Sequence, residues 1–285
     1  MPLSAVIHLE ALNEGRLDEF TGRGVHGFWF RRWAEVNPAI ADRLHEESQE
    51  ACFTLSPVTL ADPLPGRRDG WGLVRAGQPA FMRVAILEEG LEGEFLSGWL
   101  NGLENGDPLE APASREQNGE SLPGIRWKVT GAAVQSGDHP LARQETYQEL
   151  TRRCLMASNP PRQWLLEFLT PTTFHGKVAH LPFPLPESLI NSWIRRWQTF
   201  APLALPEEEM IAWARSNLAI SAFSMRTLPV REGKRLRVGV VGTMTLRALD
   251  MPPYLRAAID LLANYALYCG SGSHTTQGMG QTRLL

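Results

Sequence analysis

The sequence contains few lysines, few cysteines and no long apolar run. Only three of its 28 basic residues are lysine, so most positive charge is carried by arginine, whose planar guanidinium suits phosphate recognition. The three cysteines, Cys52, Cys154 and Cys269, are odd in number and far apart, which favours reduced thiols over a disulfide framework or a zinc site. No window approaches the roughly 18 apolar residues of a membrane span. The first residues have no basic segment ahead of an apolar run, so we expect a cytoplasmic protein with no signal peptide and no membrane partner.

The composition is that of a folded protein with an uneven charge. A chain of 285 residues that is 43% hydrophobic and 21% charged suits one large domain or two ordinary ones. Residues 86–120 carry nine acids and one base, whereas residues 226–285 carry eight bases and three acids. The net charge of −3 argues weakly against nucleic acid binding. The asymmetry nevertheless allows one face to bind a polyanion.

Hydrophobic patterns divide the chain into two units with the same order of elements. The first unit has strands expected at 3–9, 52–55, 81–87 and 125–134, and helices at 22–36, from Pro38 onward and at 91–103. The second has strands expected at 164–169, 218–228, 235–246 and 279–284, and helices at 187–200 and 252–268. Each unit reads βαββαβ. We therefore expect an α+β protein of two tandem ferredoxin-like domains, residues 1–137 and 138–285, with a polar linker at 135–143 and an acidic surface loop at 106–123.

The C-terminal segment YCGSGSHTTQGMGQTRLL, residues 268–285, is rich in glycine and hydroxyl groups and contains no acid. Glycine permits positive φ and lets backbone N–H groups line a concavity, which suits a phosphate. The candidate contacts are Gly270, Gly272, Ser273, His274, Thr275, Gly278 and Gly280. The sequence has neither a strand-first G-x-G-x-x-G nor a G-K-[ST], so this is not a nucleotide-binding loop of the usual kind. The alternative interpretation is a helix C-cap followed by a tight connection.

Four segments carry motifs that occur together and in order. They are GVHGFWFRRWAEVNPAIADRLHEESQEACFTLSPV at 24–58, FLTPTTFHGK at 168–177, SWIRRW at 192–197, and G-x-G-x5-G-M-G at 270–280. Together they resemble the CRISPR-associated endoribonucleases that process precursor CRISPR RNA, members of the repeat-associated mysterious protein superfamily. The resemblance runs nearly end to end and implies the same tandem ferredoxin-like fold.

The resemblance implies cleavage of repeat RNA within a long transcript, with no metal ion and no other cofactor. The ribose 2′-hydroxyl would attack its neighbouring phosphate and leave a 2′,3′-cyclic phosphate and a 5′-hydroxyl. Such chemistry needs a base near the 2′-oxygen, an acid near the leaving 5′-oxygen and a cation near the phosphate. The implied partner is CRISPR repeat RNA. A homodimer and an effector complex that receives the product both stay open.

His26 and His45 are the candidate base and acid. They lie 11 residues before and 8 residues after Asn37, so two helices folding back at that corner would bring both imidazoles level within about a turn. The non-catalytic interpretation is that His26 fills the side of an amphipathic helix and His45 is solvated. The family often adds a Tyr or a Lys, but Phe30 and Ala51 stand in those neighbourhoods. Tyr268 is therefore the third catalytic candidate, with Arg23 or Lys177 as a cation.

The remaining candidate RNA contacts are basic side chains, whose ordinary interpretation is solvated charge. They are Lys177, Arg195, Arg196, Arg235 and Arg237. His175 and His180 have no acid between them, and we predict no metal site there. Two other functions remain open. One is a non-catalytic subunit that holds CRISPR RNA in an effector complex, and the other is a phosphate-binding protein unrelated to RNA.

Overall fold

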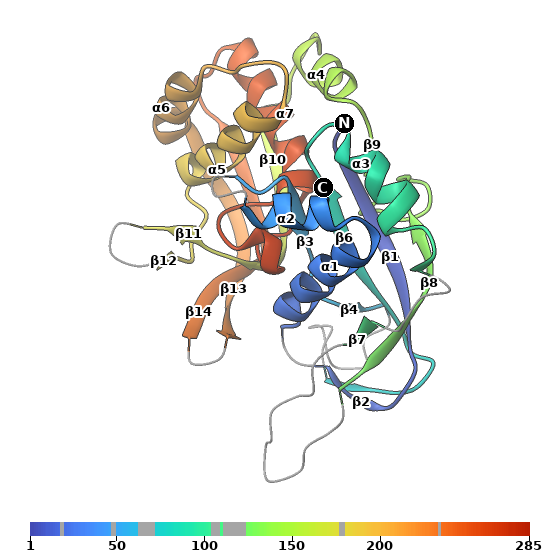
Figure 1. The fold of residues 1–285 in the computed structure, drawn as a ribbon. Helices are drawn as coiled ribbons and strands as arrows, with labels where there is room; N and C mark the ends of the chain where they lie inside the picture. The colour runs from blue at the N-terminus through green and yellow to red at the C-terminus, as the bar shows by residue number, and fades with distance from the viewer. Residues whose placement is uncertain are drawn as a thin grey trace.

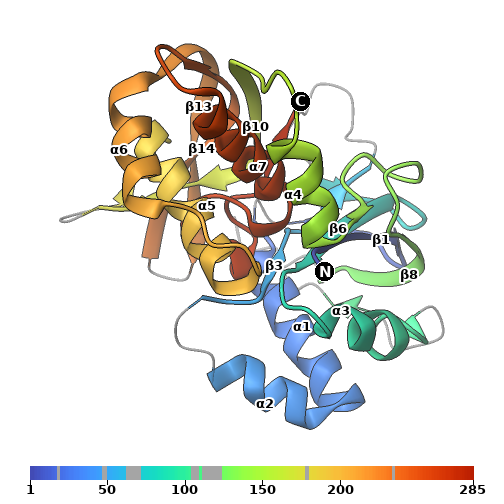
Figure 2. The same ribbon diagram turned by 90° about the horizontal axis from the view of Figure 1, so that it is seen from above.

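The computed structural model describes residues 1–17, 20–46, 50–61, 72–103, 109–110, 124–176, 180–232 and 235–285 of the chain. Its described part is an α+β arrangement with two main antiparallel sheets, one formed by each half of the chain (Figure 1). Figure 2 views the same ribbon from above, with helices α1 and α2 on one side and helices α5 and α6 on another.

The first sheet has the strand order β3-β6-β1-β8-β7. Its strands are β1 (Leu3–Ala11), β3 (Phe53–Leu55), β6 (Pro79–Ile86), β7 (Leu109–Glu110) and β8 (Arg126–Ala133), with β4 (Thr59–Leu60) paired to β6 and β9 (Arg143–Gln144) paired to β1. Helices α1 (Gly22–Val36) and α2 (Pro38–Glu46) connect β1 to β3. Helix α3 (Leu91–Glu94) continues as the π-helical turn η1 (Phe95–Trp99) before β8. A small separate sheet pairs β2 (Gly15–Leu17) with β5 (Gly72–Val74).

The second sheet has the strand order β13-β14-β10-β15. Its strands are β10 (Gln163–Thr172), β13 (Leu218–Glu232), β14 (Arg235–Ala248) and β15 (Thr282–Leu284). The helices of this half are α4 (Tyr147–Leu155), α5 (Pro186–Phe200), α6 (Glu207–Asn217) and α7 (Pro253–Cys269), and a 3-10 turn η3 (Thr275–Gln277) precedes β15. A short hairpin of β11 (Phe174–His175) and β12 (His180–Leu181) follows β10.

The two sheets share one topology. If the four principal strands of each half are numbered along the chain, both sheets read second, third, first, fourth, with helices after the first and third strands. The predicted tandem ferredoxin-like fold is confirmed. The division at residue 137 stays a prediction, and β9, which lies beyond it, still pairs with β1 of the first sheet.

Some elements were not expected from the sequence. Helices α4 and α6 and the short strands β2, β5, β11 and β12 are additions to the two βαββαβ units. The expected acidic loop at 106–123 lies mostly outside the described residues, which include only β7 there. None of the described helices combines the length and apolar character needed to cross a bilayer.

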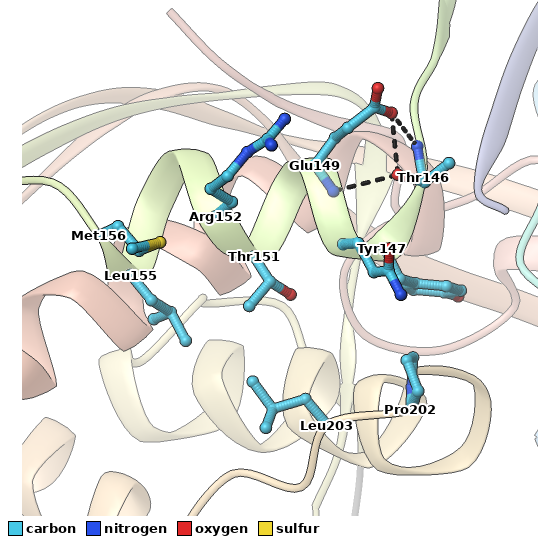
Figure 3. A pocket seen from close by; sticks show the side chains of 10 residues that line it. Thr146, Tyr147, Glu149, Thr151, Arg152, Leu155, Met156, Pro202 and Leu203 are labelled. Carbon is cyan, nitrogen blue, oxygen red and sulfur yellow. Dashed lines mark hydrogen bonds between the residues drawn. The ribbon is translucent and has the colours of Figure 1, made fainter.

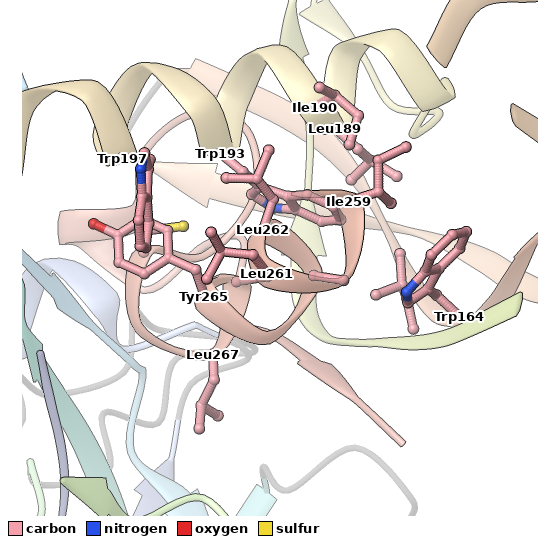
Figure 4. Packing of buried hydrophobic residues seen from close by; sticks show 14 of the residues in the cluster. Trp164, Leu189, Ile190, Trp193, Trp197, Ile259, Leu261, Leu262, Tyr265 and Leu267 are labelled. Atoms are coloured by element: carbon pink, nitrogen blue, oxygen red, sulfur yellow. The ribbon is translucent and has the colours of Figure 1, made fainter. Parts of the chain in front are cut away.

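The core of the second half forms where α5 and α7 pack together (Figure 4). Along α5, Leu189, Ile190, Trp193 and Trp197 recur at helical spacing, and all four side chains are fully buried. The Trp197 ring meets the Tyr265 ring of α7 edge to face, with centroids 5.2 Å apart. This packing fixes the direction of α7, and so it fixes where the glycine-rich segment begins.

Buried polar contacts join the end of α7 to the first sheet. The Arg83 guanidinium on β6 donates to the Leu267 carbonyl and to the Gln281 side chain. Burial lowers the pKa of Arg83 to about 10. Thr54 of β3 donates to the Tyr268 carbonyl at 3.0 Å. The C-terminal segment is therefore anchored against the N-terminal half rather than left as a free tail.

Candidate active site

Helix α1 carries one candidate histidine at the edge of its buried face. Val25, Phe28, Trp29 and Trp33 are buried against the first sheet, at the spacing of an amphipathic helix. His26 and Phe30, one turn apart, are half-buried beside that stripe. The helix ends at Asn37, whose N–H donates to the Trp33 carbonyl at 2.7 Å, and α2 starts at Pro38 as predicted.

The Phe30 ring brings His26 and His45 together. The His26 imidazole meets it edge to face with centroids 4.9 Å apart, and the His45 imidazole stacks on it at 3.8 Å with 24° between the planes. The distance between the two imidazole centroids therefore cannot exceed the sum of these two centroid distances. His45 is exposed on the last turn of α2, while His26 is half-buried. The corner at Asn37 therefore brings the two histidines near each other, in line with the sequence prediction.

The glycine loop (residues 270–280) is a turn structure whose backbone is hydrogen-bonded to itself and to neighbouring elements. Gly270, Gly272, Gly278 and Gly280 have φ of +67°, +75°, +91° and +70°. The N–H groups of residues 270–273, 277, 279 and 280 all donate to acceptors inside the protein. The prediction that these N–H groups cradle a phosphate is wrong in this structure, because their hydrogen bonds are already made. The alternative, a helix C-cap followed by a tight connection, describes this part of the loop.

Side chains of the loop divide between buried and accessible. Ser273 and Thr275 are buried, and the Ser273 hydroxyl donates to the Thr173 carbonyl at 3.1 Å. His274, Thr276 and Gln277 are half-buried. Of the predicted loop contacts, His274 is thus a side chain that reaches solvent, whereas Ser273 and Thr275 serve the structure of the loop.

The loop lies against the start of helix α1. Figure 1 shows a red loop beside the blue helix α1, and η3 of the glycine loop contacts α1 and β3. The approach is so close that a Cβ on Gly22 would lie 1.8 Å from the Gln277 carbonyl oxygen. One result is a hydrogen bond of 3.0 Å between Nδ1 of His26 and the Thr276 carbonyl. The loop therefore reaches the candidate site through a carbonyl group.

This contact defines the state of His26. A carbonyl oxygen only accepts, so Nδ1 carries the proton, and in the neutral ring Nε2 keeps its lone pair. Burial lowers the pKa of His26, the Thr276 carbonyl opposes that shift, and His45 and Arg23 lower the pKa further. Near neutral pH, His26 is therefore mostly an uncharged imidazole with a free acceptor nitrogen.

The neighbouring arginines of α5 differ in their surroundings. Arg196 is buried, and its guanidinium donates to the Cys269 carbonyl, to the Thr275 hydroxyl at 2.6 Å and to Glu50 at 3.4 Å. Arg195 is exposed and pairs with Glu50 at 2.5 Å. The prediction of an RNA contact is therefore wrong for Arg196, whose donors support the glycine loop from inside, and it stays a prediction for Arg195.

The position of Tyr268 does not suit a catalytic role. Its side chain is fully buried, and its hydroxyl donates to Glu145 at 2.8 Å. Burial, followed by the Glu145 charge, raises the pKa of this phenol far above its usual range. The prediction of a catalytic Tyr268 is corrected, because a buried phenol held by a carboxylate cannot touch an RNA strand.

The other predicted contacts have mixed outcomes. Lys177 lies outside the described residues, and Arg235 lies on β14 with its side chain outside the description. Arg237 of β14 is half-buried, and burial and the nearby Arg23 lower its pKa. Phe30 and Ala51, which stand where the resemblance led us to expect a Tyr and a Lys, both pack against the first core.

A pocket of about 710 Å³ lies elsewhere, between α4 and the segment that follows α5 (Figure 3). Figure 3 shows Thr151 and Leu155 of α4 facing Leu203, with Arg152 and Glu149 turned toward another side. None of the predicted site residues lines it. In the described ranges, no group of three or more His, Cys, Asp or Glu residues is placed to hold a metal ion.

Sequence reasoning missed the groups that connect the site to the rest of the protein. The Thr276 carbonyl has no side-chain signature, and Glu50, which joins the segment after α2 to α5, was not singled out. The acceptor pattern of a loop depends on its path in space, so spacing along the chain carries little signal for it.

Comparisons with known proteins identify relatives of this chain. Residues 166–282 match the family described as CRISPR-associated endoribonuclease Cas6, and residues 1–111 match the CRISPR Cas6 N-terminal domain. The proteins called CRISPR-associated endoribonuclease Cas6 in two strains of Mycobacterium tuberculosis are 25% identical over 169 residues, 59% of this chain and 52% of their own. The match thus spans about half the length of these curated relatives.

Solved structures match over the whole chain. A Cas6 product complex has a TM-score of 0.76 and 26% identity, covering 100% of both chains. Thermus thermophilus Cas6 has a TM-score of 0.71 and 25% identity, covering 100% of this chain and 98% of its own. A structure described as a RAMP protein binding different RNA substrates has a TM-score of 0.57 at 13% identity, which supports the fold alone.

Proposed function

The chain belongs to the CRISPR-associated Cas6 endoribonuclease family, and from this membership we propose that it cuts CRISPR repeat RNA to release mature guide RNA. The proposed reaction uses the ribose 2′-hydroxyl as its nucleophile and needs no metal ion. The full-length match to a Cas6 product complex supports the substrate class.

The observation that carries the mechanism is the pair of imidazoles on the Phe30 ring, one of them fixed by a backbone carbonyl. His26, uncharged near neutral pH and with Nδ1–H bound to Thr276, offers Nε2 as a base. His45 is exposed and stacked on the same ring, so it can reach the other side of a bound phosphate. We assign His26 as the base and His45 as the acid.

The proposed reaction moves one proton to His26 and one proton from His45. His26 Nε2 accepts the 2′-hydroxyl proton as the 2′-oxygen attacks phosphorus. The bond from phosphorus to the 5′-oxygen breaks, and protonated His45 gives its proton to the leaving oxygen. The products are a 2′,3′-cyclic phosphate and a 5′-hydroxyl. Arg23 lies at the exposed start of α1, close enough to His26 to lower its pKa, and supplies positive charge for the phosphorane oxygens.

Incubation of the purified protein with end-labelled repeat RNA in excess EDTA tests this proposal. We expect one discrete cut with a cyclic phosphate end. Variants His26→Ala and His45→Ala should each slow the cut by about 10²–10⁴-fold, while the matched variant His139→Ala, which changes a histidine of another region, should cut at the original rate. A cut that requires added magnesium, or equal rates in all variants, contradicts the mechanism.

The main alternative is a non-catalytic subunit that holds CRISPR RNA. The packing of Phe30 and Ala51 on the core, where the family often has a Tyr and a Lys, favours it. The same incubation distinguishes the two, because a holder binds the repeat RNA without cutting it. A homodimer and an effector complex remain predictions. The bonded N–H groups of residues 270–273, 277, 279 and 280 weigh against the phosphate-binding alternative.

A further inference from the structure

Three imidazoles that are remote in sequence meet beside the candidate site. His175 and His180 face each other across the β11–β12 hairpin, with ring centroids 4.9 Å apart. His274 of the glycine loop lies 6.2 Å from His175 and 5.9 Å from His180. We call these three residues the histidine cluster. His175 and His180 are exposed, and the proposed reaction uses none of the three.

The charged groups around the histidine cluster are positive. The charges that act on His180 and His274 come from the cluster itself and from Arg237 of β14, and Arg23 of α1 acts on Arg237 in turn. No carboxylate is among these groups in the described part of the chain. Lys177 and the side chain of Arg235 lie outside that part. A group of side chains with this sign of charge attracts an anion.

Hydrogen-bond capacity is also available there. Nε2 of His274 is buried and has no hydrogen-bond partner among the described residues. Burial, and then Arg237, lower the pKa of His274 to about 4, and burial and His175 lower the pKa of His180. His180 and His274 are therefore held largely uncharged at neutral pH by their surroundings. An arriving anion would oppose the part of this shift that comes from the neighbouring positive charges.

Resting on the proposed function, we propose that His175, His180 and His274, together with Arg237, bind a second phosphate of the repeat RNA next to the cut and take up a proton as they do so. The position follows from the loop, because His274 stands two residues before Thr276, whose carbonyl holds His26. Arg23 lies near both His26 and Arg237 and so spans the two phosphates.

Proton uptake gives the site a distinct signature. A bound phosphate raises the pKa of the imidazoles, so affinity grows as pH falls and is lost as pH rises through the pKa of the bound state. Each imidazole whose pKa rises by one unit adds up to about tenfold in affinity at low pH. Among the described residues, no group of three or more His, Cys, Asp or Glu is placed to hold a metal ion, and the absence of a metal from this site stays a prediction.

The test uses a repeat RNA with a 2′-deoxy group at the cut, which removes the nucleophile and keeps the phosphates. Its dissociation constant is measured between about pH 8 and about pH 5.5 in EDTA at constant ionic strength. In the double variant His175→Asn/His180→Asn, we expect the gain in affinity on lowering the pH to be about tenfold smaller than in the original protein. The variant should also show a salt dependence shallower by about one counterion. Titration calorimetry in two buffers should show about one proton fewer taken up by the variant.

The chain provides a matched control in a second pair of imidazoles, His8 and His139, with centroids 6.0 Å apart on β1 and in the connection after β8. His8→Asn/His139→Asn should keep the original pH dependence. Unchanged affinity and proton uptake in His175→Asn/His180→Asn, or an equal loss in the control, overturns the phosphate site. Failure of the original protein to bind or cut the repeat RNA would instead overturn the proposed function.

Discussion

Truncation of Arg196 separates a structural arginine from an RNA-binding one. In Arg196→Ala, the Cys269 carbonyl and the Thr275 hydroxyl stay buried and lose their donor. A buried polar group without a partner costs about 1–3 kcal/mol. Glu50 also loses a partner but keeps Arg195. We therefore expect a loss of about 3–5 kcal/mol in the free energy of unfolding, and a fall in melting temperature of about 6–10 °C for a chain of this length.

The adjacent arginine is the control for this experiment. Arg195 has 58% of its side chain exposed and a single ion pair, so Arg195→Ala should change the free energy of unfolding by less than about 1 kcal/mol. Thermal and urea melts of both variants measure the difference, and filter binding of 2′-deoxy repeat RNA measures affinity. If Arg196→Ala melts like the original protein but binds RNA more weakly with a shallower salt slope, Arg196 is an RNA contact and the structural role is refuted.

Three further predictions follow from the site and the loop. As pH is lowered, the cleavage rate should start to fall only below the ordinary histidine pKa of 6.5, because the base must be uncharged and the pKa of His26 is lowered. A pH–rate profile whose acid limb lies above that value contradicts the role of His26 as the base. Stability should fall as pH drops from about 6.5 to about 4, because the unfolded chain binds the His274 proton before the folded one does, and His274→Gln should flatten this part of a melting-temperature profile. In urea melts, Gly272→Ala should destabilise the protein more than Gly77→Ala. Both glycines have a similar positive φ, but a Cβ at position 272 would lie 2.2 Å from the Thr173 carbonyl oxygen, whereas a Cβ at position 77 would meet open space. Equal losses of stability in the two variants would exclude the close contact.

Much of the fold could be predicted because its signals are local. The corner at Asn37-Pro38, the apolar spacing of α1 and α5 and the order of the strands all depend on residues a few positions apart. The two unexpected helices also had local signals. Thr146 and Glu149 form a capping box at the start of α4, and α6 begins with three glutamates after Pro206. These helices were missed because a βαββαβ pattern does not require them.

The candidate site was predicted only in part, and the errors share one cause. The pattern of residues located His26, His45 and the glycine loop, and the packing of α1 and α2 on Phe30 accounts for the meeting of the two imidazoles. The same pattern could not distinguish Arg195 from Arg196, because the difference lies in burial against the end of α7, 73 residues away. It also led to the wrong prediction for Tyr268, whose hydroxyl faces a carboxylate 123 residues earlier.

Short-range spacing in the sequence specifies helices, strands, their order and the residue types available for chemistry, since these depend on backbone geometry and on periodic burial. The state of each side chain depends on groups that arrive from elsewhere. The hydrogen bond that fixes His26 joins residues 250 positions apart, and the histidine cluster joins a hairpin to the last loop of the chain. Such contacts form only when both halves have packed, because desolvation and charge act through space over a few ångströms and carry no period along the chain.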